Sequence, residues 1–141
     1  MNRSARTYQT QQVMTASPAQ LVAMLYDKAI LSLREAVRAI EAGDIQARFN
    51  ANKRAGDIIT HLFTTLDVER GGEIAANLSR RYTFMLSRVT FVDVRNDPEP
   101  AREVIALLEP LRESWNQIAR GDKPAVAAPA AAAAGGLSVS A

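Results

Sequence analysis

Apolar residues recur every three or four positions in four separate stretches of this 141-residue chain. At about 100° per residue, this spacing places the apolar side chains on one face of an α-helix. Amphipathic helices joined by short breaks bury such faces against one another, so the pattern predicts an all-α fold, an antiparallel up-and-down four-helix bundle. The four apolar faces consist of Val22, Tyr26, Ala29, Leu33, Ala36, Val37 and Ile40; Ile45, Phe49, Ala55, Ile59, Leu62, Phe63 and Leu66; Ile74, Leu78, Tyr82, Met85, Val89 and Val92; and Val104, Leu108, Leu111, Trp115 and Ile118.

The first predicted helix has clear signals at both ends. Ser17 and Gln20 have the spacing of a capping box, and Pro18 suits the first helical position, where a missing amide hydrogen is harmless. Gly43 ends this helix, because glycine readily adopts the left-handed conformation of a helix C-terminus. Asp44 is then placed to cap the second helix.

The remaining helix boundaries follow from glycine, proline and acidic residues. Pro110 lies inside the fourth apolar pattern, where proline removes a backbone hydrogen bond, so we expect a kink or a loose turn there. We expect the second helix to end at about Val68, followed by a break at Gly71-Gly72. We expect a third helix from Glu73 to about Arg95. The fourth helix should have Asp97 as its cap, Pro98 in its first turn and Gly121 at its end.

Composition divides the chain into three parts. We expect a polar N-terminal arm at residues 1–16, the bundle at residues 17–121, and a tail at residues 122–141. Residues 124–136 contain only Pro, Ala, Val and Gly. Such a segment has no patterned face to bury, so we expect a flexible tail with transient helix at most.

Composition also excludes several classes of protein. The chain has 17 basic and 15 acidic residues, a net charge of +2, no cysteine and one histidine. Disulfides and thiolate chemistry are therefore absent, and we expect neither a metal site nor a cofactor. The arm lacks the apolar core of a signal peptide, and no apolar run approaches the roughly 20 residues that span a bilayer. We expect a cytoplasmic protein that does not insert into membranes.

The sequence shows no catalytic constellation, so we do not expect an enzyme. His61 has Asp57 one helical turn away, but no paired nucleophile is visible beside them. Gly71-Gly72 could cradle a phosphate only with a preceding strand and a following lysine, and both are missing. We interpret these glycines as a helix break.

A row of arginines raises one alternative function. Arg81, Arg88 and Arg95 are seven residues apart on one face of the third helix, with Arg80 beside them and Phe84 and Phe91 flanking the row. Basic groups between aromatic rings are typical of single-stranded nucleic-acid binding, which would make the protein a small RNA-binding bundle. We do not expect nucleic acid as the partner, because so few charges supply few of the phosphate contacts on which such affinity depends.

Some apolar residues fall outside the core faces and are candidates for partner binding. Phe84 and Phe91 lie nearly opposite the centre of their stripe, Met24 and Leu31 lie opposite theirs, and Leu21 lies at an edge. They either widen the core or form a second apolar surface into which a helical ligand packs. The N-terminal arm could cover that surface in the absence of a partner. The candidate contact residues are Tyr8, Val13, Met14, Leu21, Met24, Leu31, Phe84 and Phe91.

Several short motifs resemble those of one protein family, the flagellin-specific secretion chaperones. The resemblance covers about residues 8–120, and the order and spacing of the motifs make it specific. The motifs are Tyr8 with Val13; Thr15-Ala16-Ser17-Pro18-Ala19-Gln20-Leu21-Val22; Met24-Leu25-Tyr26-Asp27; Ala39-Ile40-Glu41 with Gly43-Asp44; Gly71-Gly72-Glu73-Ile74-Ala75; Asn77-Leu78; Tyr82 with Met85; Arg95-Asn96-Asp97; and Leu107-Leu108 with Leu111-Arg112 and Trp115.

The resemblance implies a cytoplasmic helical-bundle chaperone. Such a protein binds the C-terminal helical segment of new flagellin, prevents premature polymerisation and delivers flagellin to the flagellar type III export apparatus. A regulatory adaptor that binds another flagellar protein, and so couples flagellin supply to gene expression, is the main alternative. The sequence leaves open whether the bundle forms a homodimer by exchanging its N-terminal segment.

Overall fold

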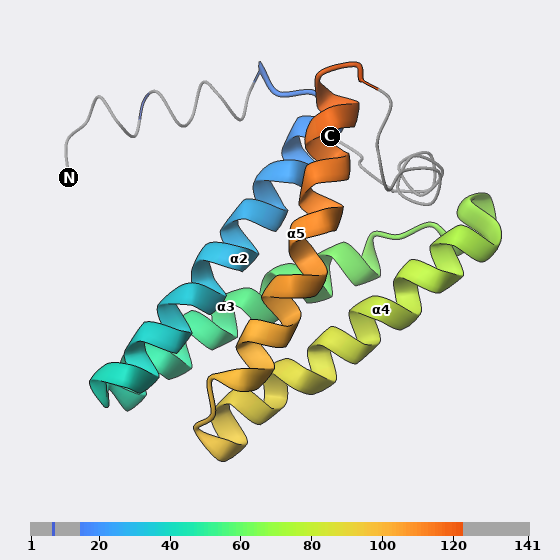
Figure 1. Cartoon of the computed structure of the whole chain (residues 1–141). Helices are drawn as coiled ribbons and strands as arrows, with labels where there is room; N and C mark the ends of the chain where they lie inside the picture. The colour runs from blue at the N-terminus through green and yellow to red at the C-terminus, as the bar shows by residue number, and fades with distance from the viewer. Residues whose placement is uncertain (1–6, 8–14, 123–141) are drawn as a thin grey trace.

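The computed structural model describes residue 7 and residues 15–122, which contain four α-helices (Figure 1). The helices are α2 (Pro18–Ala42), α3 (Ile45–Thr64), α4 (Val68–Arg95) and α5 (Glu99–Ala119). Each helix packs against the next along the chain, and α5 also packs against α2, which closes the ring of helices. The predicted all-α antiparallel four-helix bundle is confirmed.

The predicted signals at the first two helix starts are present as hydrogen bonds. The hydroxyl oxygen of Ser17 accepts from the amide of Gln20 at 3.2 Å, and the Gln20 side chain accepts from the amide of Ser17 at 2.7 Å. Gly43 has φ of 71°, the left-handed conformation expected at the end of α2. Asp44 caps α3 by accepting from the amide of Ala47 at 3.0 Å.

The connection between α3 and α4 differs from the prediction. Helix α3 ends at Thr64, not near Val68, and the carboxylate of Asp67 caps α4 by accepting from the amide of Arg70 at 3.1 Å. The predicted break is present as a kink inside α4, where Gly72 has φ of 55° and ψ of −137°. A capping carboxylate therefore starts the helix one turn before the glycine pair.

Helix α5 also differs in two respects from the prediction. Pro98, not Asp97, is the N-cap of α5, and it makes no side-chain cap bond; Asp97, one residue earlier, accepts from the amide of Glu99 at 3.0 Å. The helix ends at Ala119, just before Gly121 in a left-handed conformation. The helix is continuous through Pro110, however, and no loose turn forms there. Buried residues on both sides of Pro110 hold the helix against its neighbours, which compensates for the missing backbone hydrogen bond.

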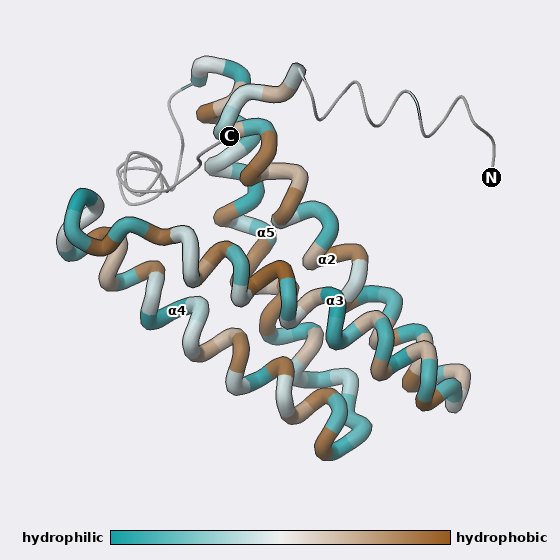
Figure 2. The backbone as a smooth tube through the Cα atoms, turned by 180° about the vertical axis from the view of Figure 1, so that it is seen from behind, coloured by the Kyte–Doolittle hydropathy of each residue, from teal (hydrophilic) through white to brown (hydrophobic). Residues whose placement is uncertain are grey.

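The core contains the apolar faces of all four helices. Figure 2 shows hydrophobic and hydrophilic residues alternating along each helix, as expected for helices with one buried face. Trp115, Tyr26 and Tyr82 are the largest fully buried side chains, and Trp115 and Tyr82 thus occupy the core positions that their spacing predicted.

The predicted core face of α3 is wrong at its N-terminal end. Ile45 and Phe49 are 64% and 48% exposed, whereas Arg48 and Asn52 are buried. The buried face is therefore rotated relative to the apolar pattern, because two polar side chains with partners occupy core positions there.

Arg48 and Asn52 join α3 to the end of α4 through a polar network. Arg48 donates to the Asp93 carboxylate at 3.0 Å and to the Asn96 side chain at 2.7 Å. Asn52 donates to the carbonyl of Val89 at 2.9 Å and to Asp93 at 3.1 Å. These bonds fix the two helices in register at this end of the bundle.

Candidate partner-binding surface

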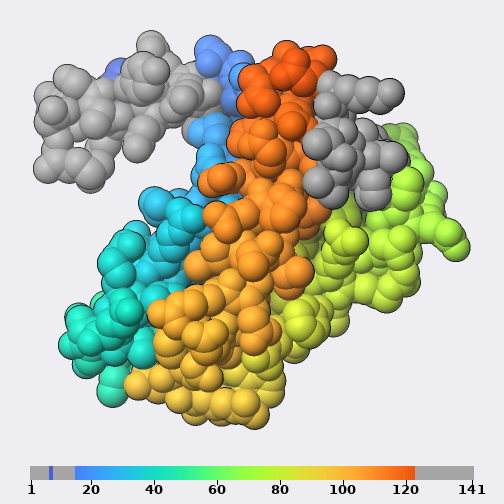
Figure 3. All heavy atoms as spheres, in the orientation of Figure 1, coloured from blue at the N-terminus to red at the C-terminus, as the bar shows by residue number. Residues whose placement is uncertain are grey.

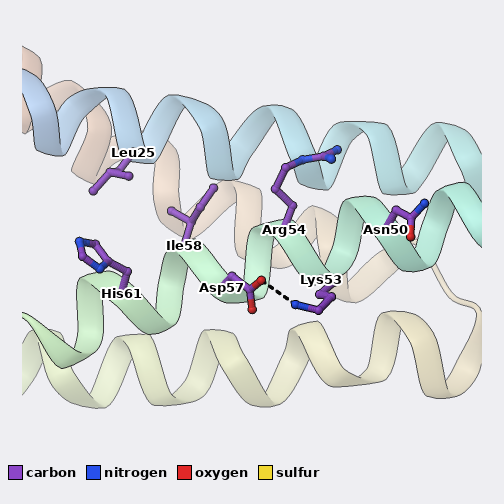
Figure 4. Close-up of a pocket in the computed structure, with 7 residues that line it drawn as sticks. All are labelled: Leu25, Asn50, Lys53, Arg54, Asp57, Ile58 and His61. Carbon is purple, nitrogen blue, oxygen red and sulfur yellow. Dashed lines mark hydrogen bonds and ion pairs between the residues drawn. The ribbon is translucent and has the colours of Figure 1, made fainter. Parts of the chain in front are cut away.

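Two hollows with apolar walls lie between neighbouring helices. The first, which we call the α2–α3 groove, has a volume of about 530 Å³. Figure 4 shows Leu25 of α2 directed toward Ile58 and His61 of α3, so these three side chains form one end of the groove. The groove is lined by Leu25, Asn50, Lys53, Arg54, Asp57, Ile58 and His61.

The charged side chains of the α2–α3 groove are paired with one another or with α2. Lys53 donates to the Asp57 carboxylate at 2.9 Å, the interaction drawn in Figure 4. Arg54 donates to the Glu35 carboxylate at 2.6 Å and to the Ser32 hydroxyl at 3.1 Å. The groove therefore offers a partner mainly its apolar end.

The second hollow, which we call the α4–α5 groove, has a volume of about 760 Å³. It lies between α4 and α5. Figure 3 shows α5 running between α2 and α4. Phe84 of α4 and Leu107 of α5 are 50% and 37% exposed, so both apolar side chains are accessible to a ligand. The groove is lined by Asn77, Arg80, Arg81, Phe84, Ala106, Leu107, Pro110 and Leu111.

The predicted contact residues of α2 do not share one groove with those of α4. Met24 is half-buried and lines a third hollow, of about 330 Å³, between the start of α2 and Asn116 near the end of α5. Leu21 is half-buried, and Leu31 is 52% exposed. The remaining candidates, Tyr8, Val13 and Met14, lie outside the described residues.

The predicted contact residues of α4 have different surroundings. Phe84 lines the α4–α5 groove, whereas Phe91 is half-buried beneath two guanidinium groups. The guanidinium carbons of Arg88 and Arg95 lie 5.4 Å and 4.4 Å from the centre of the Phe91 ring, within the range of cation–π attraction. Arg88 also donates twice to the Glu103 carboxylate, at 3.0 Å and 2.9 Å. The predicted basic row is thus partly engaged within the protein.

The surroundings of His61 provide no catalytic arrangement. His61 is exposed at the edge of the α2–α3 groove, and the nearby Asp57 carboxylate is paired with Lys53. Within residues 7 and 15–122, no group of three or more His, Cys, Asp or Glu side chains is placed to hold a metal ion. The helices described are also too short or too polar to cross a membrane.

Sequence reasoning missed several residues that line the two grooves, notably Leu25, Ile58 and Leu107. Each lies about 70° from the centre of the buried face of its own helix, at about 100° per residue. The helical spacing of the sequence contains this edge position. An edge residue predicts a groove, however, only when the facing edge of the neighbouring helix is also known, and the sequence does not show which edges face each other.

The sequence of the chain is similar to those of one family of known proteins. The family model described as "Flagellar protein FliS" matches residues 1–122. The flagellar secretion chaperone FliS of Salmonella typhimurium is 44% identical over 107 residues, covering 75% of this chain and 79% of that protein. The FliS proteins of Vibrio cholerae and Campylobacter jejuni are 36% and 32% identical, covering 76% and 83% of this chain and 79% and 91% of their own lengths.

Proposed function

Because the chain belongs to the FliS family of flagellar secretion chaperones, we propose that it binds the C-terminal helical segment of flagellin in the cytoplasm. In this proposal, the bound chaperone prevents premature polymerisation of flagellin and delivers it to the flagellar type III export apparatus. The protein acts by binding alone, without catalysis and without a cofactor.

The observation that carries this proposal is the presence of apolar walls in grooves between helices. Leu25 with Ile58, and Phe84 with Leu107, line hollows of about 530 and 760 Å³. A helical ligand uses such hollows for side chains that recur every three or four residues. A flagellin terminus that is not yet in a filament lacks helical neighbours. Grooves of this kind supply substitute neighbours, and coupled folding lets the ligand wrap a large surface while remaining releasable.

Calorimetry with the full chain and a fragment of the C-terminal part of its flagellin tests the proposal. We expect micromolar or tighter binding and a negative heat-capacity change, with no nucleotide or metal added, because apolar surface is buried. Absence of both heat and heat-capacity change would refute it.

Variants of the candidate contact residues locate the binding surface. We propose that Leu21, Met24, Leu31, Phe84 and Phe91, together with Tyr8, Val13 and Met14 of the arm, contact the partner. Replacing Met24, Leu31 or Phe84 by alanine should weaken binding of the flagellin fragment about tenfold or more where the side chain is an anchor. Val94→Ala is the matched control, because Val94 is 70% exposed and lines neither groove.

The separation of the two grooves favours a second candidate function, that of a regulatory adaptor. Leu25 and Phe84 belong to helices that are not consecutive, and their grooves share no lining residue. A second flagellar protein could therefore bind while flagellin occupies one groove. Affinity purification from motile cells, followed by mass spectrometry, would distinguish the functions by whether flagellin or a regulator is the main bound protein.

A further inference from the structure

The α4–α5 groove combines an apolar wall with cations that have no acidic partner. Phe84 and Leu107 form the exposed wall, and Leu111 is buried beneath them. Arg81 makes no salt bridge within the described part of the chain, and Arg80 bonds only to the neutral side chain of Asn77. The lining of this groove contains no acidic residue.

The acidic residues of α5 do not neutralise these arginines. Glu103 is paired with Arg88, Glu109 with Arg34, and Glu113 with Arg120. Each of these carboxylates is therefore engaged by a guanidinium group outside the groove. The α2–α3 groove differs, because its lysine and arginine are both paired with acidic residues. Positive charge without compensation is thus a property of the α4–α5 groove in particular.

The backbone of α5 adds a polar feature to the same groove. Pro110 has no amide hydrogen, so the carbonyl of Ala106, one turn earlier, lacks its usual helical donor. Both residues line the groove. A ligand side chain that donates a hydrogen bond, such as serine or glutamine, would satisfy this carbonyl.

We propose that the α4–α5 groove binds an amphipathic helix of a partner protein whose apolar stripe is flanked by acidic residues. Apolar anchors three or four positions apart would pack on Phe84 and Leu107, while flanking carboxylates pair with Arg80 and Arg81. The inference goes beyond the proposed function, because it specifies the charge of the ligand whether or not that ligand is flagellin.

The same features favour a peptide over RNA as the occupant. A nucleic-acid strand needs a continuous run of cations and several aromatic faces for stacking. Arg88 is held by Glu103, Arg95 lies over Phe91, and Phe84 is the one aromatic side chain in the lining of the groove. A single exposed ring beside two arginines suits one apolar anchor with flanking carboxylates.

Binding of two designed peptides to the full chain tests the proposal. Both are fluorescein-labelled helices of about 18 residues with leucine at positions i, i+3, i+4 and i+7, flanked by glutamate in one peptide and by lysine in the other. By fluorescence anisotropy, we expect micromolar binding of the glutamate peptide and at least about tenfold weaker binding of the lysine peptide. Equal affinities would overturn the proposal, as would tighter binding of a labelled oligouridylate than of the glutamate peptide.

Matched variants show whether the binding occurs in this groove. Arg81→Glu and Phe84→Ala should each weaken the glutamate peptide about tenfold. Arg38→Glu is the control, because Arg38 is an exposed arginine of α2 that also makes no salt bridge with any described residue and lines neither groove. An equal loss in Arg38→Glu would mean that net charge alone attracts the peptide, which contradicts the proposal.

An NMR measurement on the unaltered chain tests the same assignment without relying on variants that must fold. Addition of the glutamate peptide should shift the backbone NMR signals of residues 77–84 and 106–111. Shifts confined to other parts of the bundle would overturn the assignment of the groove.

Discussion

At the scale of single residues, the centre of the bundle is defined by two tyrosines. The hydroxyls of Tyr26 and Tyr82 are hydrogen-bonded to each other, and both side chains are fully buried. Burial raises the pKa of Tyr82 to about 12, although its hydrogen bond with Tyr26 acts in the opposite direction. Burial, and then the neighbouring Tyr82, raise the pKa of Tyr26 well above its usual value of 10.0. Both hydroxyls therefore stay neutral in the folded protein over the physiological pH range.

These pKa values predict a loss of stability in alkaline solution. A tyrosine whose pKa is higher in the folded than in the unfolded state contributes stability below pH 10, and that contribution is lost as the pH rises through about 12. Each such proton contributes a slope of up to about 1.4 kcal/mol per pH unit. Urea unfolding across this window should show a steep decrease for the unaltered chain and a shallower one for Tyr82→Phe. Parallel curves for the two proteins would contradict the prediction.

Trp115 and Phe84 should behave differently on replacement by alanine. Trp115 is buried in the core, so Trp115→Ala should lower the free energy of unfolding by about 3–5 kcal/mol. Phe84 is half exposed at a groove, so Phe84→Ala should cost much less, while it weakens partner binding. Denaturant unfolding and calorimetry of both variants check this pair of outcomes. If Phe84→Ala were as destabilising as Trp115→Ala, Phe84 would be a core residue and not a contact residue.

At the scale of helices, the ends of α3 and α4 are held by polar contacts more than by apolar packing. Arg48 is 9% exposed and bonds to both Asp93 and Asn96. Loss of one partner leaves a largely buried charge without compensation, which costs more than the intact pair contributes. The network therefore specifies how α3 and α4 are aligned.

A double-mutant cycle on Arg48 and Asp93 tests this role. Arg48→Ala and Asp93→Ala should each destabilise the protein by about 2 kcal/mol, because each leaves a poorly solvated partner. The double variant should be less destabilised than the sum of the two, with a coupling energy of about 1 kcal/mol or more. Additive effects in urea unfolding would show that the two side chains act independently.

At the scale of the whole molecule, the four described helices form a ring in which each packs mainly against two neighbours, and the Tyr26–Tyr82 hydrogen bond joins α2 to α4 across the centre. Consecutive helices make three of these contacts, and the packing of α5 on α2 makes the fourth. This arrangement buries one face of every helix and leaves the outer edges of neighbouring helices to form grooves. The stability of the bundle thus depends on residues within the described helices.

Removal of the C-terminal tail tests whether the stability of the bundle depends on residues within the helices. Residues 124–141 have no apolar pattern to bury, so truncation after Lys123 should leave the melting temperature nearly unchanged. Thermal unfolding followed by circular dichroism measures this directly. A decrease of many degrees would mean that the tail packs on the bundle.

The sequence by itself determined the number of helices, their antiparallel order and most of their ends. Ser17 and Asp44 cap their helices through bonds to residues three positions away, so a short window of sequence contains the whole interaction. The buried faces of α2, α4 and α5 follow from apolar spacing for the same reason. The motifs that resemble the chaperone family also lie within short segments, and the comparisons confirm that family.

Only the tertiary structure decided which apolar residues are exposed and which grooves exist. Ile45 and Phe49 are exposed because Arg48 and Asn52 find partners on α4, a contact that apolar spacing within α3 does not reveal. A groove is formed by the edges of two helices, so it depends on their rotation and their relative shift along the bundle. Helical periodicity describes each helix alone, and packing between helices sets both of those quantities.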